Sequence, residues 1–211
     1  MLDALRTEAS SCIRCALSQT RTQVVFGNGH PDADLMFVGE APGFHEDQQG
    51  IPFVGQAGKL LDKLLAGIGL TRADVYVANT LKCRPPGNRD PLPDEKQKCE
   101  PWLFKQIELI RPKVIATLGN HATKQLTGKE TGITRIHGEP QQAVYGPVTV
   151  TIFPLYHPAA ALYTPAMLKV LEEDFAKLPA LLEHEIEPIP SLAELVGEPN
   201  AEPVAVQLGL F

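Results

Sequence analysis

Four short apolar runs limit the possible folds of this 211-residue chain more than any other feature of its sequence. Each run is rich in β-branched residues and is bounded by glycine, proline or polar residues, as buried strands are. Segments with helical periodicity separate the runs, and strands that alternate with helices form parallel sheets covered on both faces. We therefore predict an α/β fold, a three-layer α/β/α sandwich around a mainly parallel sheet of four strands: 34–39, 74–81, 113–119 and 148–156.

The segments between the strands predict the outer layers of the fold. Residues 56–69 carry an apolar stripe of leucines and end at a glycine, which indicates an amphipathic helix. Residues 94–110 begin with acidic side chains and continue amphipathic, although we expect Pro101 to kink or divide this helix. Residues 157–184 are expected to begin as a turn and to continue as a helix.

The net charge of −6 is unevenly distributed along the chain. The last Lys or Arg is Lys177 and six acidic residues follow it, which leaves 19 acidic against 19 basic residues in 1–182. A formally neutral body can carry a basic DNA-binding face while an acidic tail stays away from DNA. Prolines and glutamates without periodicity are typical of a flexible segment, so we expect one domain at 1–184 and a flexible acidic tail at 185–211.

The four cysteines of the chain are expected to act together. The N-terminus lacks the pattern of a secretory signal and no apolar run reaches membrane-spanning length, so we expect a cytoplasmic protein outside the membrane. Clustered thiols in a reducing cytosol indicate metal binding or catalysis, the alternative being four unrelated buried cysteines. On ligand type alone, an iron–sulfur cluster and tetrahedral zinc suit the set equally well: Cys12, Cys15, Cys83 and Cys99.

Unusual segments follow three of the predicted strands. The sequence GEAPG (39–43) follows the first strand, Asn79 lies near the end of the second, and HPAAAL (157–162) follows the fourth. Each of these is, taken alone, more typical of an ordinary turn. The carboxyl ends of parallel strands share one edge of a sheet, where ligands bind, so the three together predict a ligand crevice.

These motifs resemble those of the family 4 uracil-DNA glycosylases. The likeness extends over about residues 1–180 and includes GEAPGFHEDQQGIPFVGQAGKLL, NTLKCRPPGNRDP, YHPAAAL and the cysteine spacing. It implies a [4Fe-4S] cluster on the four cysteines, which would staple the N-terminal segment and residues 83–99 to the body. It also implies a monomeric enzyme that flips uracil out of DNA and hydrolyses its N-glycosidic bond, leaving an abasic site for base excision repair without cutting the strand.

The same resemblance implies roles for side chains of the crevice. Asn79 would read the edge of uracil, because an amide offers a donor and an acceptor together. Phe53 would stack on the flipped ring, its alternative role being core packing. His157 would donate toward uracil O2 as negative charge develops there, with backbone N–H groups of 39–43 adding to the effect.

Two positions depart from the best-known glycosylases. Those enzymes hold the attacking water with an aspartate where this chain has Ala41, so Glu40 is our candidate for positioning water. They also carry a tyrosine, which blocks the methyl group of thymine, where this chain has Gly43. By resemblance Glu46 would supply that block, and the alternative for Glu46 is a solvated loop acid.

DNA contacts are expected from three segments, which contain Lys82, Arg84 and Arg89, then Asn120 and His121, then Arg135, Ile136 and His137. The first three would meet phosphates, and the residues after the third strand would offer N–H groups at a helix start. Residues 135–137 would press into the duplex, the alternative being a plain hairpin turn.

A related subfamily links covalently to DNA through a histidine in a basic insertion. Residues 82–91 have neither, so we expect ordinary turnover.

The last five residues, QLGLF, resemble the peptide by which bacterial replication and repair proteins bind the sliding clamp. A flexible linker would carry this apolar tip into a groove of the clamp and tether the enzyme to new DNA: Gln207, Leu208, Leu210 and Phe211. The alternative is a tail that folds back on its own domain.

Two other functions remain open from the sequence. The same pocket and cysteines would serve a non-catalytic module that binds DNA or a partner. A zinc-stapled enzyme that handles nucleotides is the third possibility.

Overall fold

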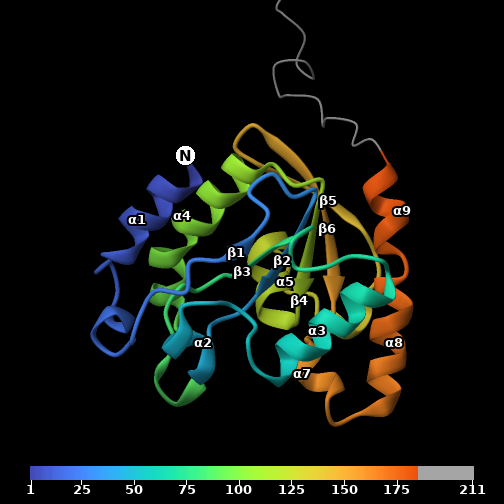
Figure 1. Ribbon diagram of the computed structural model, residues 1–211, viewed down its shortest axis with the longest axis horizontal. Coiled ribbons are helices and arrows are strands. Elements are labelled where there is room, and N and C mark those ends of the chain that lie inside the picture. The colour runs from blue at the N-terminus through green and yellow to red at the C-terminus, as the bar shows by residue number, and fades with distance from the viewer. Residues whose placement is uncertain (185–211) are drawn as a thin grey trace, which may run out of the picture.

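A six-stranded sheet runs through the centre of the computed structural model, which describes residues 1–184 (Figure 1). The predicted tail and its terminal peptide, 185–211, therefore lie outside the described residues. The strand order across the sheet is β1-β3-β2-β4-β6-β5. Their bounds are β1 (Asn28–Gly29), β2 (Leu35–Gly39), β3 (Tyr76–Asn79), β4 (Val114–Leu118), β5 (Gln141–Tyr145) and β6 (Val148–Leu155).

The four predicted strands are confirmed and form the parallel centre of the sheet. β2 pairs in parallel with β3 and with β4, and β4 pairs in parallel with β6. The prediction of four strands was too low, because β1 and β5 add antiparallel edges to β3 and β6. β1 has two residues and β5 alternates between more exposed and less exposed positions, so neither forms an apolar run.

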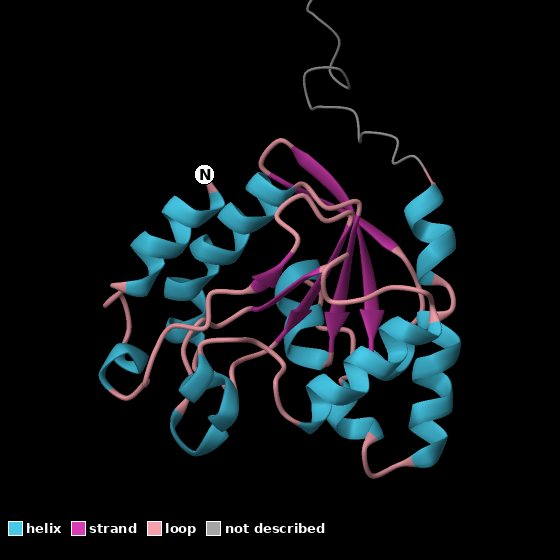
Figure 2. Cartoon of the chain, viewed as in Figure 1, coloured by secondary structure: helices cyan, strands magenta, loops and turns pink. Residues whose placement is uncertain are grey.

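Helices cover both faces of the sheet, which confirms the three-layer architecture (Figure 2). On one face, α3 (Gln56–Gly67), α7 (Pro158–Ala161), α8 (Pro165–Phe175) and α9 (Leu178–Glu183) contribute to a core with Leu35 and Phe37. On the other face, α4 (Pro93–Ile110) and α5 (Asn120–Thr127) pack over Met36 and Val38. Successive side chains of a strand point to opposite faces, so the all-apolar β2 serves both cores.

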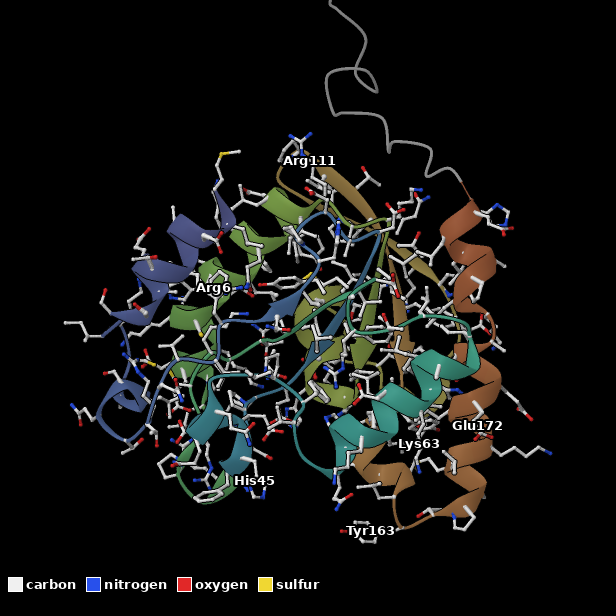
Figure 3. The ribbon with its side chains drawn as sticks, viewed as in Figure 1. Arg6, His45, Lys63, Arg111, Tyr163 and Glu172 are labelled. Atoms are coloured by element: carbon white, nitrogen blue, oxygen red, sulfur yellow. The ribbon has the colours of Figure 1, made fainter. Side chains whose placement is uncertain are left out.

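A third apolar cluster joins the N-terminal segment to α4. It contains Ala9 of α1 (Leu2–Ser10), Leu17 of the short helix η1 (Ala16–Gln19) and Trp102 of α4, together with Cys83 and Cys99. Arg6 of α1 also places its guanidinium 5.7 Å from the ring of Phe26 (Figure 3). The N-terminal segment is thus packed onto the body of the domain.

Two helical predictions are refined by the structure. α4 is not divided at Pro101, since its helix continues from Pro93 to Ile110. Residues 157–184 form three helices, α7 to α9, in place of a turn and one helix. The remaining short elements are α2 (Phe44–Gln49), η2 (Pro86–Asn88) and α6 (Ile133–Ile136). Within residues 1–184, no helix is both long and apolar enough to cross a membrane.

Candidate active site

Segments at the carboxyl ends of β2, β3 and β6 enclose a pocket of about 360 Å³. α3, which follows β2, and α5, which follows the neighbouring β4, lie on opposite faces of the sheet. Where the connections after two neighbouring strands leave toward opposite faces, a crevice opens at the carboxyl ends of the strands. Ligands bind in this crevice in open α/β sheets. All residues predicted for catalysis or uracil binding line this pocket: Glu40, Ala41, Gly43, Glu46, Phe53, Asn79 and His157.

Asn79 ends β3 with its side chain buried in this pocket. The residue is 2% exposed, and its Oδ1 atom has no hydrogen-bond partner among the described residues. Gly39 pairs with Asn79 in the sheet, and a Cβ atom on Gly39 would lie 2.5 Å from this Oδ1 and 2.7 Å from the ring of Phe53. A buried amide oxygen without a partner is costly unless a ligand satisfies it, so its place in the pocket points to a bound donor.

Phe53 is held in a strained backbone conformation. Its φ angle is 55°, in the left-handed region that side-chain-bearing residues rarely adopt. Arg72 Nη2 donates to its carbonyl oxygen at 2.9 Å, and a Cβ atom on Gly58 of α3 would overlap that oxygen. The ring lies 5.6 Å from the imidazole of His157 with 26° between the planes. Strain of this kind is concentrated at functional sites.

His157 is held as a neutral donor by its own loop. It follows β6 and caps α7, where its Nδ1 accepts from the backbone N–H of Ala159 at 3.1 Å. A neutral imidazole with an accepting Nδ1 carries its proton on Nε2. Burial lowers the pKa of His157 to about 4, although the nearby charge of Glu46 raises it. At pH 7 the ring therefore offers an Nε2–H group and no positive charge.

Glu46 ties α2 to the start of α3. Its Oε1 accepts from the backbone N–H groups of Val54 and Gly55, both at 3.0 Å, and Gly55 caps the N-terminus of α3. It is therefore not the solvated loop acid of the alternative interpretation. A Cβ atom on Gly43 would lie 2.7 Å from its other oxygen, Oε2, so the carboxylate occupies the space that a side chain at 43 would need.

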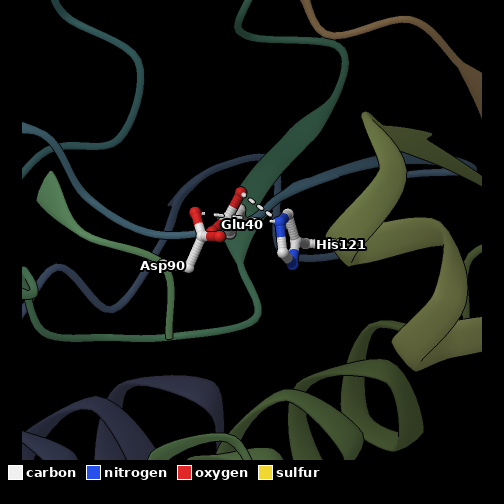
Figure 4. Close-up of side chains that lie close together, drawn as sticks. All are labelled: Glu40, Asp90 and His121. Carbon is white, nitrogen blue, oxygen red and sulfur yellow. Dashed lines mark ion pairs between the residues drawn. The ribbon is translucent and has the colours of Figure 1, made fainter. Parts of the chain in front are cut away.

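Glu40, the first residue after β2, belongs to a small group of charged side chains (Figure 4). His121 Nε2 lies 4.0 Å from Glu40 Oε2 and 3.9 Å from Asp90 Oδ1. On the other side of the imidazole, Lys96 Nζ lies 3.5 Å from Nδ1. Burial raises the pKa of the Glu40 carboxyl group, and the charge of His121 opposes this effect.

Lys82 was wrongly predicted to meet phosphates. It is 1% exposed, and its Nζ donates to the backbone oxygen of Asn79 at 2.8 Å and to Gln106 Oε1 at 2.6 Å. Burial lowers its pKa to about 8. This ammonium group is an internal support behind Asn79, because it is enclosed and its hydrogen bonds go to the protein.

The two predicted arginine contacts already have partners. Arg89 donates through both terminal nitrogens to Glu95, at 2.6 and 2.9 Å, and lines the pocket. Arg84 donates through Nε to Asn88 at 2.7 Å, and its guanidinium lies 5.2 Å from the ring of Phe44. Arg89 is thus held in a bidentate ion pair, whereas Arg84 lies beside an exposed aromatic ring.

The other predicted DNA contacts lie at two places. α5 begins at Asn120 as expected, and Asn120 Oδ1 accepts from the backbone N–H of Ile133, which starts α6. Residues 133–136 are helical and do not form the hairpin turn of the alternative. Arg135 is exposed there. His137 is instead anchored, with Nδ1 2.7 Å from Asp174 Oδ2 and its ring 4.6 Å from Tyr156, so the structure does not support its insertion into a duplex.

The four cysteines line one small pocket, so they are not unrelated. All four are free thiols, with Cys83 and Cys99 buried and the other two half-buried. Three N–H groups point at sulfur atoms: Arg21 Nη1 to Cys83 at 3.3 Å, the backbone of Lys82 to Cys99 at 3.2 Å, and Trp102 Nε1 to Cys12 at 3.4 Å. Burial raises the pKa of Cys83 and raises that of Cys99 to about 12.

Sequence reasoning missed Asp90, Lys96 and Gln106. Asp90 stands in the loop that carries Arg84 and Arg89, and Lys96 stands in the predicted helix, but nothing in their spacing indicates that both would reach His121. Gln106 is fully buried on α4, where it donates to Phe26 and accepts from Lys82. An amide in an amphipathic helix gives no sign of such a role.

Comparisons with known proteins identify the family of this chain. The sequence model of the Uracil DNA glycosylase superfamily matches residues 26–179, and the chain belongs to this superfamily. Within it, the expected likeness to type 4 is confirmed. The chain is 49% identical over 182 residues to a Type-4 uracil-DNA glycosylase of Sulfurisphaera tokodaii, covering 84% of this chain and 83% of the relative. It is 38% identical over 188 residues to that of Thermotoga maritima, covering 88% and 96%.

Proposed function

We propose that this chain is a monofunctional uracil-DNA glycosylase, which flips uracil out of DNA and hydrolyses its N-glycosidic bond. The observation that carries the proposal is the buried Asn79 amide, whose Oδ1 lines the pocket and lacks a partner within the described part of the chain. The curated relatives carry the name of this activity. A duplex hides the scissile bond, so the nucleotide must leave the stack, and a pocket of about 360 Å³ has room for one pyrimidine.

Asn79 and Phe53 would recognise the extruded base. The Asn79 amide accepts from uracil N3–H through Oδ1 and donates to O4 through Nδ2. Phe53 offers its ring for stacking, held in place by the strained backbone and by Arg72. Two hydrogen bonds and one stacking contact fix the ring in the orientation that the reaction needs.

His157 would stabilise the departing base. When the bond from N1 to C1′ of the sugar breaks, its electron pair stays with uracil and negative charge develops on O2. The Nε2–H group of the neutral imidazole donates to O2 and keeps its proton, as a preorganised dipole does. Backbone N–H groups of residues 39–43 add to the same effect.

Glu40 would position the attacking water. The sugar becomes cation-like as the base departs, and the water oxygen forms the new bond to C1′. The Glu40 carboxylate accepts one proton of that water, and the uracil anion is protonated after release. The products are free uracil and an abasic site, with the strand uncut. Ala41 stands beside Glu40 in the same pocket and offers no carboxylate of its own.

Glu46 would exclude thymine. Its carboxylate fills the space beside Gly43, and two backbone N–H groups hold it there. Thymine differs from uracil by one methyl group, which a side chain held in this way excludes by shape.

The decisive experiment is a single-turnover assay on a uracil-containing oligonucleotide, followed by alkaline cleavage of abasic sites. We expect Asn79→Ala and His157→Ala each to lower the rate about 10²- to 10³-fold, because each removes a contact made as charge develops. His184→Ala, an exposed histidine after α9, is the matched control and should keep the full rate. Binding of the oligonucleotide without any alkali-labile site would show the wild-type protein to be a non-catalytic module and refute the proposal.

We also infer that the four cysteines hold a [4Fe-4S] cluster. N–H groups directed at the sulfurs are typical partners of iron–sulfur ligands. Tetrahedral zinc, with Zn–S bonds of about 2.3 Å, needs sulfurs about 3.8 Å apart. The described cysteines do not supply three sulfurs within 4.8 Å of one another, which favours a larger group. The cluster would supply a covalent cross-link and take no part in the hydrolysis.

DNA would be gripped by Arg84 in the segment between β3 and η2, by Asn120 at the start of α5 and by Arg135 on α6. Binding of 207–211 to the sliding clamp stays a prediction, since these residues lie outside the described part. We further expect a monomer that works on DNA in the bacterial cytoplasm.

A further inference from the structure

Glu40, Asp90 and His121 come from three distant parts of the chain and meet beside the pocket (Figure 4). Glu40 follows β2, Asp90 lies between η2 and α4, and His121 stands in the first turn of α5. Their ligand atoms lie within 4.8 Å of one another. β2 and β4 are neighbours at the switch in strand order, so the sheet topology brings the Glu40 loop and the start of α5 together.

Lys96 determines which ring nitrogen of His121 carries the proton in the neutral imidazole. An ammonium group can only donate, so the contact of Lys96 Nζ with His121 Nδ1 at 3.5 Å requires Nδ1 to accept. The proton of the neutral ring then lies on Nε2, the atom that faces both carboxylates. In the neutral ring the Nε2–H group of His121 therefore faces Glu40 across 4.0 Å, so the contact is electrostatic and not a hydrogen bond.

We infer that His121 is a positioning residue for Glu40, and that with Lys96 it keeps the Glu40 carboxylate ionised and oriented toward water beside the pocket. The inference rests on the proposed glycosylase function, in which Glu40 accepts a proton from water. A half-buried carboxylate facing a second one tends to take up a proton. His121 Nε2 lies close to both carboxylates, 4.0 Å from Glu40 and 3.9 Å from Asp90, and offsets that tendency.

Each charged neighbour of Glu40 shifts the pKa of its carboxyl group in a definite direction. Burial and the charge of Asp90 raise the pKa of Glu40, whereas His121 and Lys96 lower it. Glu46, His157 and Arg89 line the same pocket, and the guanidinium of Arg89 is paired with Glu95. Removal of His121 should therefore leave Glu40 protonated over a wider acidic range, and removal of the Asp90 charge should do the opposite.

The same three side chains are also a potential ligand set for a divalent cation. Lys96 opposes that use, because a metal on His121 Nε2 would place the ring proton on Nδ1, against the ammonium group. Asp90 is also 86% exposed, so its carboxylate is largely solvated. A contact between His121 and a phosphate is the second competing role.

The test is the pH dependence of the single-turnover rate on a uracil-containing oligonucleotide at constant ionic strength. We expect the acidic limb of the profile to move to higher pH in His121→Ala, and to move less in His121→Gln, which keeps an N–H donor. In Asp90→Asn we expect the limb to move to lower pH. Glu40→Gln should lose about 10²-fold or more at every pH, as the removal of a general base does.

Asp94→Asn is the matched control, since Asp94 is an exposed carboxylate in the first turn of α4, and its profile should stay that of the wild type. A uniform loss of rate in His121→Ala without a shift of the limb means a structural role and overturns the inference. Weaker DNA binding with an altered salt dependence and an unmoved limb means a phosphate contact and also overturns it.

Metal binding is tested with ZnCl₂ and with EDTA on the wild-type protein. Zinc binding that disappears in His121→Ala, together with a rate that depends on EDTA, would overturn the inference in favour of a metal site. An inactive wild-type protein refutes the glycosylase function and this inference together. If the wild-type protein is active but the acidic limb of the pH profile does not move in His121→Ala, only the inference is refuted.

Discussion

Gly39 shows how the absence of a side chain leaves room for Asn79 and Phe53 in the pocket. A Cβ atom there would lie 2.5 Å from Asn79 Oδ1 and 2.7 Å from the Phe53 ring. We expect Gly39→Ala to fold, since the crowded atoms belong to side chains, but to displace both groups that would recognise uracil. The single-turnover rate on a uracil oligonucleotide should fall at least about tenfold, as displacement of a positioning group does.

Gly67→Ala is the control for this substitution. Gly67 ends α3, and a Cβ atom there would have no neighbour within 4 Å. Its rate should be unchanged and its free energy of unfolding higher by about 0.5–1 kcal/mol, because alanine loses less entropy in a helix. Full activity in Gly39→Ala would show that Asn79 and Phe53 are not held in place by this contact.

Lys82 shows why residue type alone misleads. A lysine beside two arginines and a glycine-containing loop is typical of a phosphate contact. The fold instead places its ammonium group behind Asn79, where it donates a hydrogen bond to Gln106 Oε1. The partner is 24 positions away on α4. Local spacing carries no information about such a pair, so the burial of Lys82 could not be predicted.

Helices α2 and α3 are linked by Glu46 rather than by apolar contact alone. Its Oε1 holds the backbone N–H groups of Val54 and Gly55, and its Oε2 lies beside Gly43. We expect Glu46→Ala to lower the ratio of the excision rates for uracil and thymine, because the space for the methyl group opens. Rates on matched oligonucleotides with a U·G or a T·G pair measure that ratio.

Glu46→Gln is the matched comparison for this link. The amide keeps one accepting oxygen and nearly the same volume, so the ratio should stay closer to that of the wild type. If Glu46→Ala slowed uracil excision and left the ratio unchanged, the carboxylate would act only as a tether for the loop of Phe53.

The strands and helices were predictable to different degrees. The parallel strands are apolar on both faces, since each serves both cores, and such runs stand out in a sequence. The edge strands β1 and β5 do not, because one has two residues and the other begins with two glutamines and is mostly not buried. Pairing with β3 and β6 makes them strands, and that pairing is tertiary.

The cysteine pocket joins the N-terminal segment to α4. Cys12 and Cys15 lie between α1 and η1, whereas Cys99 lies on α4 and Cys83 follows β3. If these thiolates share a cluster, Cys15→Ala should lose iron and acid-labile sulfide. It should also melt several degrees lower, because a lost metal site removes a cross-link.

Ser18→Ala serves as the control in the same segment, since its hydroxyl donates only to the backbone oxygen of Cys15. It should keep its iron and sulfide. Limited trypsin digestion should cut Cys15→Ala at Arg14 or Arg21 sooner than it cuts the control. Zinc in place of iron in the purified wild-type protein would contradict the cluster assignment while leaving the cross-link itself intact.

The linear sequence was enough to indicate the layered α/β fold, the family and the residues that together line one pocket. Those features rest on local pattern: apolar runs, helical periodicity, and motifs that directly follow strands whose ends must share one edge. The sequence did not indicate which side chains contact one another. Asn79 Oδ1 has no partner within residues 1–184, burial lowers the pKa of His157, and Glu40 meets His121. These features depend on burial and on contacts between distant segments, which exist only once the chain has folded.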